Sequence, residues 1–491
     1  MREIKKILIA NRGEIALRVV KSCIKMGIKT VGIFSEADKD SPLLDCVDEQ
    51  ILIGPAPSNK SYLNQDLIIK KSLEMKVDAI HPGYGFLSEN ALFAENVIKA
   101  GIIFIGPKPI SIELMGDKLS AKKTVSKFDI PLVPGLNEEI KDVDKAMLAA
   151  EKIGFPVLIK ASAGGGGKGM RIVHEKKDFK QQMKRAVSEA ENSFGNGAVF
   201  IEKYLSKPRH IEIQILADQH GNVVHLFERD CSIQRRHQKI VEEAPSAVVS
   251  EKLREIMGEA ACNVARSCNY HGAGTVEFIF ENNSFYFLEM NTRLQVEHPV
   301  TEMITGLDLV EEQINIAKGE KLTISQKDLK INGHAIEIRV CAEDPFNNFI
   351  PDTGIIELYE IPKGNGVRVD DCTKEGSEVS IYYDPMISKL IVHADNRKEA
   401  IEKMINAINH YTIYGIKTTL SFCKYALNHP DFRSGNFDTG FVNLYMEDYK
   451  SMVIENNSNK VGLAAIFQLN KMDKISTSFL PSTATNWLRN R

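Results

Sequence analysis

Three oxygen-bearing side chains stand close together in a strongly apolar part of the sequence, residues 275–291. Apolar runs flank the turn residues 281–284, and this pattern predicts a β-hairpin. Glu289 and Asn291 are two residues apart and therefore share a strand face, while Glu277 falls at about the opposite position on the partner strand. Carboxylate and amide oxygens on one sheet face suit Mg²⁺, and charges among apolar neighbours need a partner. An exposed polar sheet face is the alternative for so short a pattern.

The residues directly after this hairpin could hold a small oxyanion and take a proton from it. Arg293 can fork onto a planar anion such as bicarbonate, and Gln295 and the backbone N–H of Val296 could complete the cradle. Glu297 then stands where a general base is needed. Arg339 is a further cation in an otherwise apolar strand.

A run of four glycines, 164–167, separates two predicted strands at 156–161 and 171–173. Glycine permits positive φ and close approach of backbone N–H groups to a ligand, which suits a flap over phosphates. Lys160 and Lys168 flank the run and add positive charge. No G-x-x-x-x-G-K-[ST] motif occurs, so the loop is not a P-loop. A solvent-exposed loop without a ligand is the alternative.

The elements that must position these residues follow an α/β pattern. Strand, helix and strand alternate over residues 6–34, and further strands are predicted at 79–80 and 102–105. Residues 1–115 are therefore predicted to form a doubly wound domain whose strand ends face a ligand crevice. A second unit is predicted over about 130–205, and a third, strand-rich at first, over about 206–446.

Composition excludes several classes of protein. The 491 residues suggest two to four domains, and 62 basic against 65 acidic residues give a net charge of −3, which argues against a dedicated nucleic-acid or membrane-surface binder. The eight cysteines form no C-x-x-C pair, so neither a zinc knuckle nor a disulfide framework is expected. With no apolar signal core and no apolar run long enough to cross a bilayer, the protein is expected to be cytoplasmic.

Five motifs, in this order, resemble those of the biotin carboxylase branch of the ATP-grasp superfamily. The resemblance covers about residues 1–446, and its motifs are IANRGEIA at 9–16, HPGYGFLSEN at 81–90, KASAGGGGKGM at 160–170, ERDCSIQRRHQK at 228–239 and EMNTRLQVEHPVT at 289–301. It implies an α/β (α+β) ATP-grasp fold. The implied parts are an N-terminal doubly wound pre-ATP-grasp domain (1–115), an ATP-grasp domain (116–330) with a lid over about 130–205, a C-terminal biotin carboxylase domain (331–446) and a tail (447–491) of uncertain structure.

The resemblance also implies roles for individual residues. ATP would be held by Lys118, Lys160, Gly164, Gly165, Gly166, Gly167, Met170, Glu202, Leu205, His210, Gln234 and His237. The metal, Mg²⁺ or Mn²⁺, would be bound by Glu277, Glu289 and Asn291. Bicarbonate would be cradled by Arg293, Gln295 and Val296. The catalytic residues would be Glu297 as the base, Lys239 at the reacting phosphate, Arg293, and Arg339, which would also bind biotin and stabilise its enolate.

The implied activity is an ATP- and bicarbonate-dependent carboxylation of biotin, with carboxyphosphate as the intermediate. The family's biotin-accepting motif Ala-Met-Lys-Met does not occur, and the two Met-Lys pairs, at 75–76 and 183–184, have other neighbours. Biotin is therefore expected on a separate biotin carboxyl carrier protein. The other expected partners are a second copy of the chain, as a homodimer, and a carboxyltransferase subunit. Neither nucleic acid nor membrane is expected.

Other functions fit the sequence less well. A scaffold that kept the fold but lost catalysis would not need the metal and bicarbonate residues, and an oxidoreductase lacks the G-x-G-x-x-G motif. Carbamoyl-phosphate synthetases normally have two homologous halves, and no internal repeat is visible. The final acceptor stays open. HAIEIRVCAEDP at 334–345 and YYDPMISKL at 382–390 resemble subunits of propionyl- or methylcrotonyl-CoA carboxylases. A propionyl- or acetyl-CoA carboxylase is favoured, and pyruvate carboxylase is an alternative.

Overall fold

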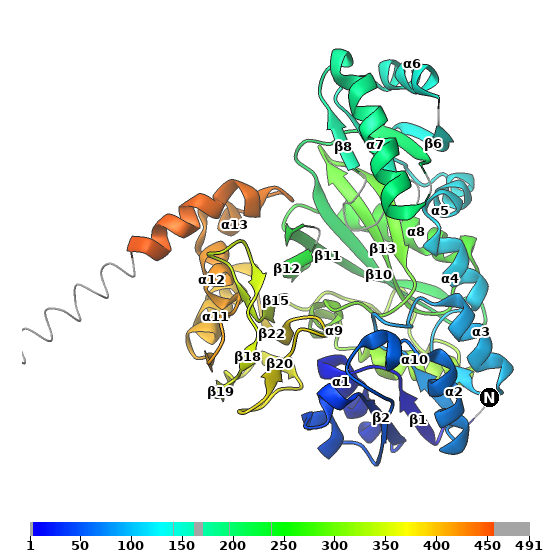
Figure 1. Ribbon diagram of the computed structural model, residues 1–491, viewed down its shortest axis with the longest axis vertical. Helices are drawn as coiled ribbons and strands as arrows, with labels where there is room; N and C mark the ends of the chain where they lie inside the picture. Colours follow the sequence, from blue (N-terminus) through cyan, green and yellow to red (C-terminus); the bar gives the residue numbers. More distant parts are fainter. Residues whose placement is uncertain (1–2, 141, 162–169, 196, 237, 456–491) are drawn as a thin grey trace, which may run out of the picture.

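A computed structural model describes residues 3–140, 142–161, 170–195, 197–236 and 238–455. Three sheets organise this part of the chain: a parallel sheet at the N-terminus, a small antiparallel sheet, and a central eight-stranded sheet. Figure 1 places the N-terminal sheet and the small sheet at opposite ends of the molecule, with the central sheet between them. None of the described helices is both long and apolar enough to cross a bilayer.

The N-terminal sheet is parallel, with strand order β3-β2-β1-β4-β5, as the alternating pattern predicts. Its elements are β1 (Lys6–Ile9), α1 (Gly13–Lys25), β2 (Lys29–Phe34), β3 (Glu49–Leu52), α2 (Gln65–Glu74), β4 (Ala79–His81), α3 (Ala91–Lys99) and β5 (Ile103–Phe104). At the carboxyl end of β1, the Asn11 side chain donates to the carbonyls of Pro82 and Tyr84 at 2.8 and 2.7 Å. These bonds join the loops after β1 and β4 at the edge where a parallel sheet offers its ligand crevice.

The small sheet has the order β6-β9-β7-β8 and carries two helices. Its elements are β6 (Gly135–Ile140), α6 (Val143–Ile153), β7 (Val157–Ala161), β8 (Met170–Val173), α7 (Phe179–Phe194) and β9 (Val199–Lys203). Val157 and Ile159 of β7 pack with Phe179 and Met183 of α7 in a core of its own. The predicted strands on either side of the glycine run pair as β7 and β8. The glycines themselves, 164–167, lie outside the described residues.

The central sheet has the order β14-β13-β10-β11-β12-β15-β22-β20. Its strands are β10 (Arg209–Ala217), β11 (Val223–Arg235), β12 (Gln238–Ala244), β13 (Gly272–Glu281), β14 (Ser284–Asn291), β15 (His334–Cys341), β20 (Val367–Asp371) and β22 (Met386–Ala394). The helices before and among them are α4 (Pro109–Gly116), α5 (Lys118–Val125), α8 (Glu251–Ser267), α9 (His298–Thr305) and α10 (Leu309–Lys318). The predicted hairpin is confirmed as β13 and β14, with Glu277 opposite Glu289. Because β12 pairs with β15, this one sheet runs across the expected domain boundary at residue 330.

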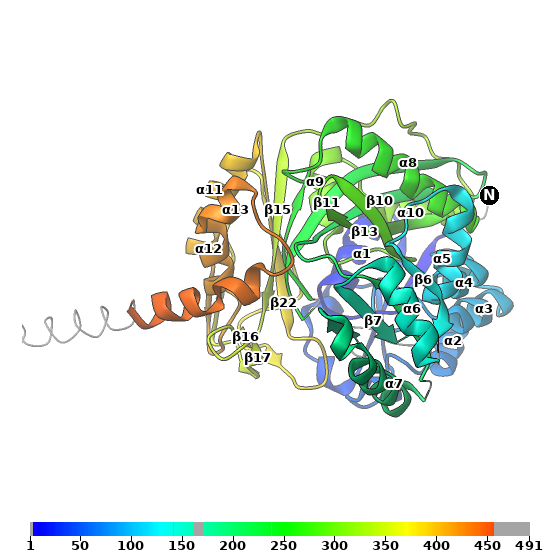
Figure 2. The same cartoon turned by 90° about the horizontal axis from the view of Figure 1, so that it is seen from above.

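Helices and short strand pairs complete the C-terminal part, on the left in Figures 1 and 2. They are α11 (Arg397–Asn409), α12 (Leu420–Asn428), α13 (Pro430–Ser434), β16 (Glu343–Asp344), β17 (Ile350–Pro351), β18 (Gly354–Ile355), β19 (Leu358–Glu360), β21 (Glu378–Val379) and β23 (Thr412–Tyr414). Residues 441–455 are helical.

Strand β15 separates an apolar layer from a charged one. Ile336, Ile338 and Val340 lie in the same core as residues of α11 and α12. The alternate positions Glu337 and Arg339 point to the other face, since successive side chains of a strand alternate. There Glu337 lies opposite Glu242 of β12, and Arg339 lies opposite Lys389 of β22. One strand thus anchors the C-terminal helices with one face and supplies charge to the site with the other.

Replacing Ile338, which is fully buried in this core, tests how far the shared sheet depends on β15. Ile338→Ala should lower the free energy of unfolding by about 2–5 kcal/mol, because it removes buried methyl groups and leaves a cavity. Urea denaturation measures the change. Ile381→Ala is the matched control, because Ile381 is 79% exposed and its loss should cost little. Equal unfolding energies for the two variants would contradict this account of β15.

Candidate active site

Two lysine side chains bind one buried glutamate of the small sheet. Glu202, in β9, accepts from Lys160 Nζ of β7 at 2.5 Å and from Lys122 of α5. Burial alone would raise the pKa of Glu202, but the two ammonium groups hold it below its usual value. Lys118 begins α5, one helical turn before Lys122, and its Nζ lies 3.9 Å from Glu289 Oε2. Three ammonium groups therefore gather between the small sheet and the hairpin.

Of the other residues expected to bind the nucleotide, the structure describes Met170, Leu205 and Gln234 here. Met170 begins β8 and is 37% exposed, and Leu205 is half-buried just after β9. Gln234 is buried in β11, opposite Lys239 of β12. His237 and the glycines 164–167 lie outside the described residues.

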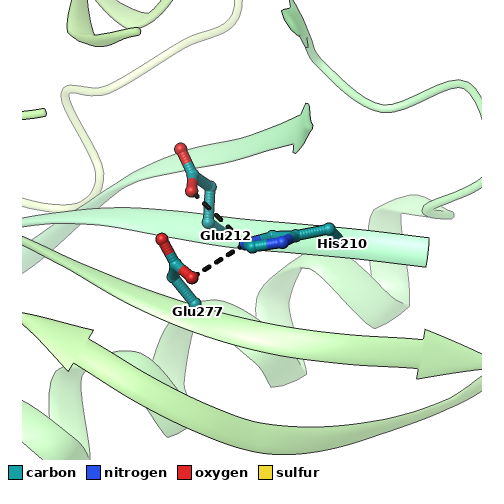
Figure 3. Close-up of side chains that lie close together, drawn as sticks. All are labelled: His210, Glu212 and Glu277. Carbon is teal, nitrogen blue, oxygen red and sulfur yellow. Dashed lines mark ion pairs between the residues drawn. The ribbon is translucent and has the colours of Figure 1, made fainter. Parts of the chain in front are cut away.

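A row of carboxylates crosses the central sheet because of its strand register. Glu212 of β10 lies opposite Glu277 of β13, which lies opposite Glu289 of β14. His210, two residues before Glu212, shares its face: its Nε2 is 2.9 Å from Glu277 Oε2 and 3.8 Å from Glu212 Oε2 (Figure 3). Burial would lower the pKa of His210, but the carboxylates of Glu277 and Glu212 together raise it above its usual value.

Lys239 is the centre of this group of acids. Its Nζ donates to Glu212 Oε2 at 2.5 Å, to Glu277 Oε1 at 3.0 Å and to Glu297 Oε1 at 2.5 Å, and its side chain is 9% exposed. Burial by itself would raise the pKa values of Glu277 and Glu297, yet Lys239 and the neighbouring cations keep both below the ordinary range. Both carboxylates are therefore ionised at neutral pH.

Arg229 of β11 holds the side chains around Lys239 in place. It is fully buried, and all five of its N–H groups donate: to Glu212, Gln214, Thr275, Gln295 and Thr301, at 2.6–3.0 Å. Gln295 accepts from Arg229 through Oε1 and donates to Glu277 through Nε2 at 2.8 Å. The amide of Gln295 is thus held in one orientation, with the loop that carries it.

Glu297 stands between two cations. Its second oxygen accepts from Arg339 Nη2 at 2.9 Å, and Arg339 Nε donates to Glu242 Oε1 at 2.6 Å. Burial raises the pKa of Glu242 to about 7, although Arg339 opposes the shift. Arg293 Nε donates to Glu89 Oε2 of the N-terminal domain at 2.6 Å, and Arg293 Nη2 donates to Asn291 Oδ1 at 3.1 Å.

These arginines face a cavity of about 490 Å³. Its wall is built from the loops after β1, β4 and β14, from Gln238 of β12 and from the C-terminal domain. Arg293, Val296 and Arg339 line it, together with Tyr84 and Tyr383. A cavity of this size, with apolar walls and a few convergent polar groups, suits a small organic ligand.

The predicted metal ligands fit a hard divalent cation. Glu277 and Glu289 are opposite each other, and Asn291 Nδ2 lies 2.9 Å from Glu277 Oε1, so oxygen-bearing groups of all three residues gather at one place. Their carboxylate and amide oxygens are the donors that Mg²⁺ and Mn²⁺ take. The structure adds a second set, His210, Glu212 and Glu277, whose ligand atoms all lie within 4.8 Å of one another.

Five residues of this site were not predicted from the sequence: Glu89, Lys122, Glu212, Arg229 and Glu242. Lys122 could have been found from its i,i+4 spacing to Lys118 on a helix. Glu212 could have been found as a charge inside the apolar strand 211–216. Glu89 and Arg229 lie inside the motifs at 81–90 and 228–239, but no local pattern assigns a role to them or to Glu242, because their partners are more than ten residues away in the sequence.

Comparison with known proteins decides the family. Three family models match: the biotin carboxylase N-terminal domain at residues 3–112, the ATP-binding domain of the carbamoyl-phosphate synthase L chain at 117–325, and the biotin carboxylase C-terminal domain at 337–444. A pyruvate carboxylase subunit from Methanothermobacter thermautotrophicus is 52% identical over 441 residues, which are 90% of each chain. The chain belongs to the biotin carboxylase family.

Two further relatives show how broad this biotin carboxylase family is. The propionyl-CoA carboxylase alpha chain of Sus scrofa is 50% identical over 449 residues, which are 91% of this chain and 62% of that one. The biotin carboxylase domain dimer of 2-oxoglutarate carboxylase from Hydrogenobacter thermophilus, crystallised with MgADP, ADP and bicarbonate, superposes with a TM-score of 0.86. It is 46% identical and covers 91% of this chain and 99% of that one. The expected ATP-grasp fold, with its N- and C-terminal biotin carboxylase domains, is confirmed.

The raised pKa of Glu242 in this biotin carboxylase site predicts a pH effect on stability. Unfolding returns the pKa from about 7 to 4.5, so above pH 4.5 the unfolded state releases a proton that the folded state keeps. Glu242 alone should therefore remove about 3 kcal/mol of unfolding free energy between pH 4.5 and 7, a contribution that Glu242→Gln should lack.

Denaturation at several pH values gives the free energy of unfolding of each protein. The value for Glu242→Gln minus that for the wild type should rise between pH 4.5 and 7. Glu259→Gln is the control, since Glu259 is 61% exposed and should give a flat difference. If the difference in unfolding free energy between Glu242→Gln and the wild type also stayed constant with pH, Glu242 would be ionised in the folded protein.

Proposed function

We propose that this chain carboxylates biotin carried on a separate protein, using ATP and bicarbonate. The observation that carries the proposal is the placement of Glu297, a buried carboxylate between Lys239 and Arg339 beside a cavity lined by Arg293 and Val296. This arrangement combines a proton acceptor, an anion cradle and a cation for a developing oxyanion.

The nucleotide would lie between the small sheet and the hairpin. Lys118 and Lys160 would bind its phosphates, and the structure adds Lys122 as a positioning partner of Lys160 through Glu202. Glu202 and Leu205 would bind adenine, with Met170 packing on the base. His210, Gln234 and His237 would contact the ribose and phosphates, and the loop Gly164, Gly165, Gly166 and Gly167 would close over them.

The metal would be held by Glu277, Glu289 and Asn291. Bound Mg²⁺ or Mn²⁺ would neutralise the charge that develops on the phosphates during transfer. Glu277 is already shared by Lys239, His210, Asn291 and Gln295, so nucleotide and metal would have to redirect at least some of these contacts.

Bicarbonate would bind Arg293, Gln295 and the backbone N–H of Val296. Glu297 would accept its proton while the bicarbonate oxygen attacks the γ-phosphorus, which gives carboxyphosphate and ADP. In the resting protein the two cations beside Glu297 keep it ionised and weakly basic, because they hold its pKa low. As Lys239 turns to the reacting phosphate and Arg339 to biotin, Glu297 would lose both partners and become a stronger base.

Biotin would occupy the cavity beside Arg339. Carboxyphosphate would break into CO₂ and phosphate, the phosphate would take the ureido N–H proton, and the biotin nitrogen would attack CO₂. Negative charge develops on the ureido oxygen when the proton leaves, before the nitrogen attacks CO₂, and the Arg339 guanidinium can stabilise it there.

The same proposal includes the partners. The carrier protein would bring biotin to the cavity, a carboxyltransferase subunit would use the product, and the chain would form a homodimer, as the similar 2-oxoglutarate carboxylase domain does. A propionyl- or acetyl-CoA carboxylase is favoured as the whole enzyme, and the motifs at 334–345 and 382–390, which resemble the propionyl or methylcrotonyl type, support an acyl-CoA carboxylase. Because relatives of similar identity are named as pyruvate and propionyl-CoA carboxylases, the partner that co-purifies with the chain decides the acceptor.

Glu297→Gln tests the base. Bicarbonate-dependent ATP cleavage should fall about 10²–10⁴-fold, because the amide cannot take the proton. Binding of ATP, measured by calorimetry, should stay near that of the wild type, because the residue acts on bicarbonate. Glu259→Gln, at the exposed surface, is the control for the charge change. A variant that keeps more than half of the wild-type rate would remove Glu297 from this role.

Arg339→Ala tests the biotin step. Biotin carboxylation should drop about 10²–10³-fold, the effect typical of losing one donor to an oxyanion, while ATP cleavage without biotin should drop less. Free biotin and a biotinylated carrier protein are both assayed, and the carrier should react faster because docking raises the effective concentration. Equal losses of the two activities would contradict a role for Arg339 specific to biotin.

A further inference from the structure

Lys389 is a fully buried cation at the meeting point of three parts of the chain. It lies in β22 of the C-terminal domain, and its side chain is 0% exposed. Its Nζ donates to the backbone carbonyl of Val296 at 3.0 Å, in the loop after β14. The same ammonium lies 3.1 Å from Glu14 Oε2 of α1 and 4.0 Å from Asp370 Oδ2 of β20.

The loop that Lys389 contacts belongs to no strand. Residues 292–297 lie between β14 and α9, so no sheet hydrogen bonds hold their backbone. Side chains from elsewhere hold it instead: Glu89 binds Arg293, and Arg229 binds Gln295. For Val296, the bond from Lys389 is the contact that anchors its carbonyl.

The anchored peptide is chemically important. The Val296 carbonyl belongs to the peptide bond that leads into Glu297, and the Val296 N–H is the backbone donor of the proposed bicarbonate cradle. The Val296 N–H lies in the preceding peptide and shares the Val296 Cα with this carbonyl, so a shift of Val296 would move the cradle N–H and the proposed base together. Fixing a reacting group within about 1 Å is worth large factors in rate.

We propose that Lys389 is a positioning residue that fixes the Val296–Glu297 peptide for bicarbonate binding and proton transfer. The inference rests on the proposed function and deepens it. Lys389 does not touch the substrate itself. It transmits the placement of α1 and β20 to the cradle, because the same ammonium lies beside Glu14 and Asp370.

The surrounding charges make a neutral variant feasible. Asp370 has a second partner, Arg368, whose Nη2 is 2.6 Å from Asp370 Oδ2. Burial raises the pKa of Glu14 to about 7 even with Lys389 present. Without the lysine, Glu14 can take up a proton and avoid an unpaired buried charge.

The test is Lys389→Met in the full chain, which keeps the volume and removes both the charge and the donor. The KM for bicarbonate in ATP cleavage should rise about 10- to 100-fold, as expected for a misplaced reacting group. The dissociation constant for ATP should stay within about twofold of wild type, since Lys389 shares no hydrogen bond or ion pair with those expected nucleotide residues that the structure describes. Arg254→Met is the matched control: it breaks a partly buried ion pair between α8 and Glu228 of β11, away from the cradle, and should leave the KM unchanged.

The possible outcomes separate the two proposals. A folded Lys389→Met protein with a bicarbonate KM within twofold of wild type overturns the inference, as does a rise in KM matched by Arg254→Met. If Lys389→Met does not fold, the double variant Glu14→Gln, Lys389→Met, which also removes the carboxylate that would lose its partner, is measured by the same criteria. A wild-type chain without bicarbonate-dependent ATP cleavage would refute the proposed function itself, and this inference with it.

Discussion

The contact on which the site depends is the one between the Lys239 ammonium and three buried carboxylates, Glu212, Glu277 and Glu297. Three acids this close would repel one another and take up protons if no cation stood between them. With Lys239 in place, Glu277 and Glu297 remain charged although they are almost out of contact with water. Arg229 and Arg339 extend the same compensation to both sides.

This compensation explains why the central sheet is built as it is. Carboxylates that stand side by side on β10, β13 and β14 need cations from strands that follow in the sheet, and β11, β12 and β15 supply Arg229, Lys239 and Arg339. Breaking one partner of such a group is costly, because it leaves an uncompensated buried charge. The charged layer is therefore both a requirement for the chemistry and a constraint on which strands must be neighbours.

The sequence was sufficient to predict much of this arrangement. Alternation and turn residues predicted the β13–β14 hairpin and with it the opposition of Glu277 and Glu289, because strand register follows from local pattern. The motifs predicted the family and hence the ATP-grasp fold. The sequence does not predict which charged side chains form hydrogen bonds and ion pairs with one another across the sheet. Arg229 binds residues from four other segments, and Lys389 joins α1, β20 and a loop, and neither network leaves a local trace in the sequence.

The pairing of β12 with β15 has a consequence for how such chains can be recombined. The matches to the ATP-binding and C-terminal family models end and begin at residues 325 and 337, so the sequence offers a natural joint there. The backbone offers no such joint, since residues 241–244 of β12 pair one by one with residues 338–335 of β15, on the other side of it. A chimera spliced at this joint inherits the register only if both parents share it. A slip of one residue would turn Arg339 toward the helices and Ile338 toward the acids. Module exchange between relatives is therefore limited by strand register and not by sequence similarity.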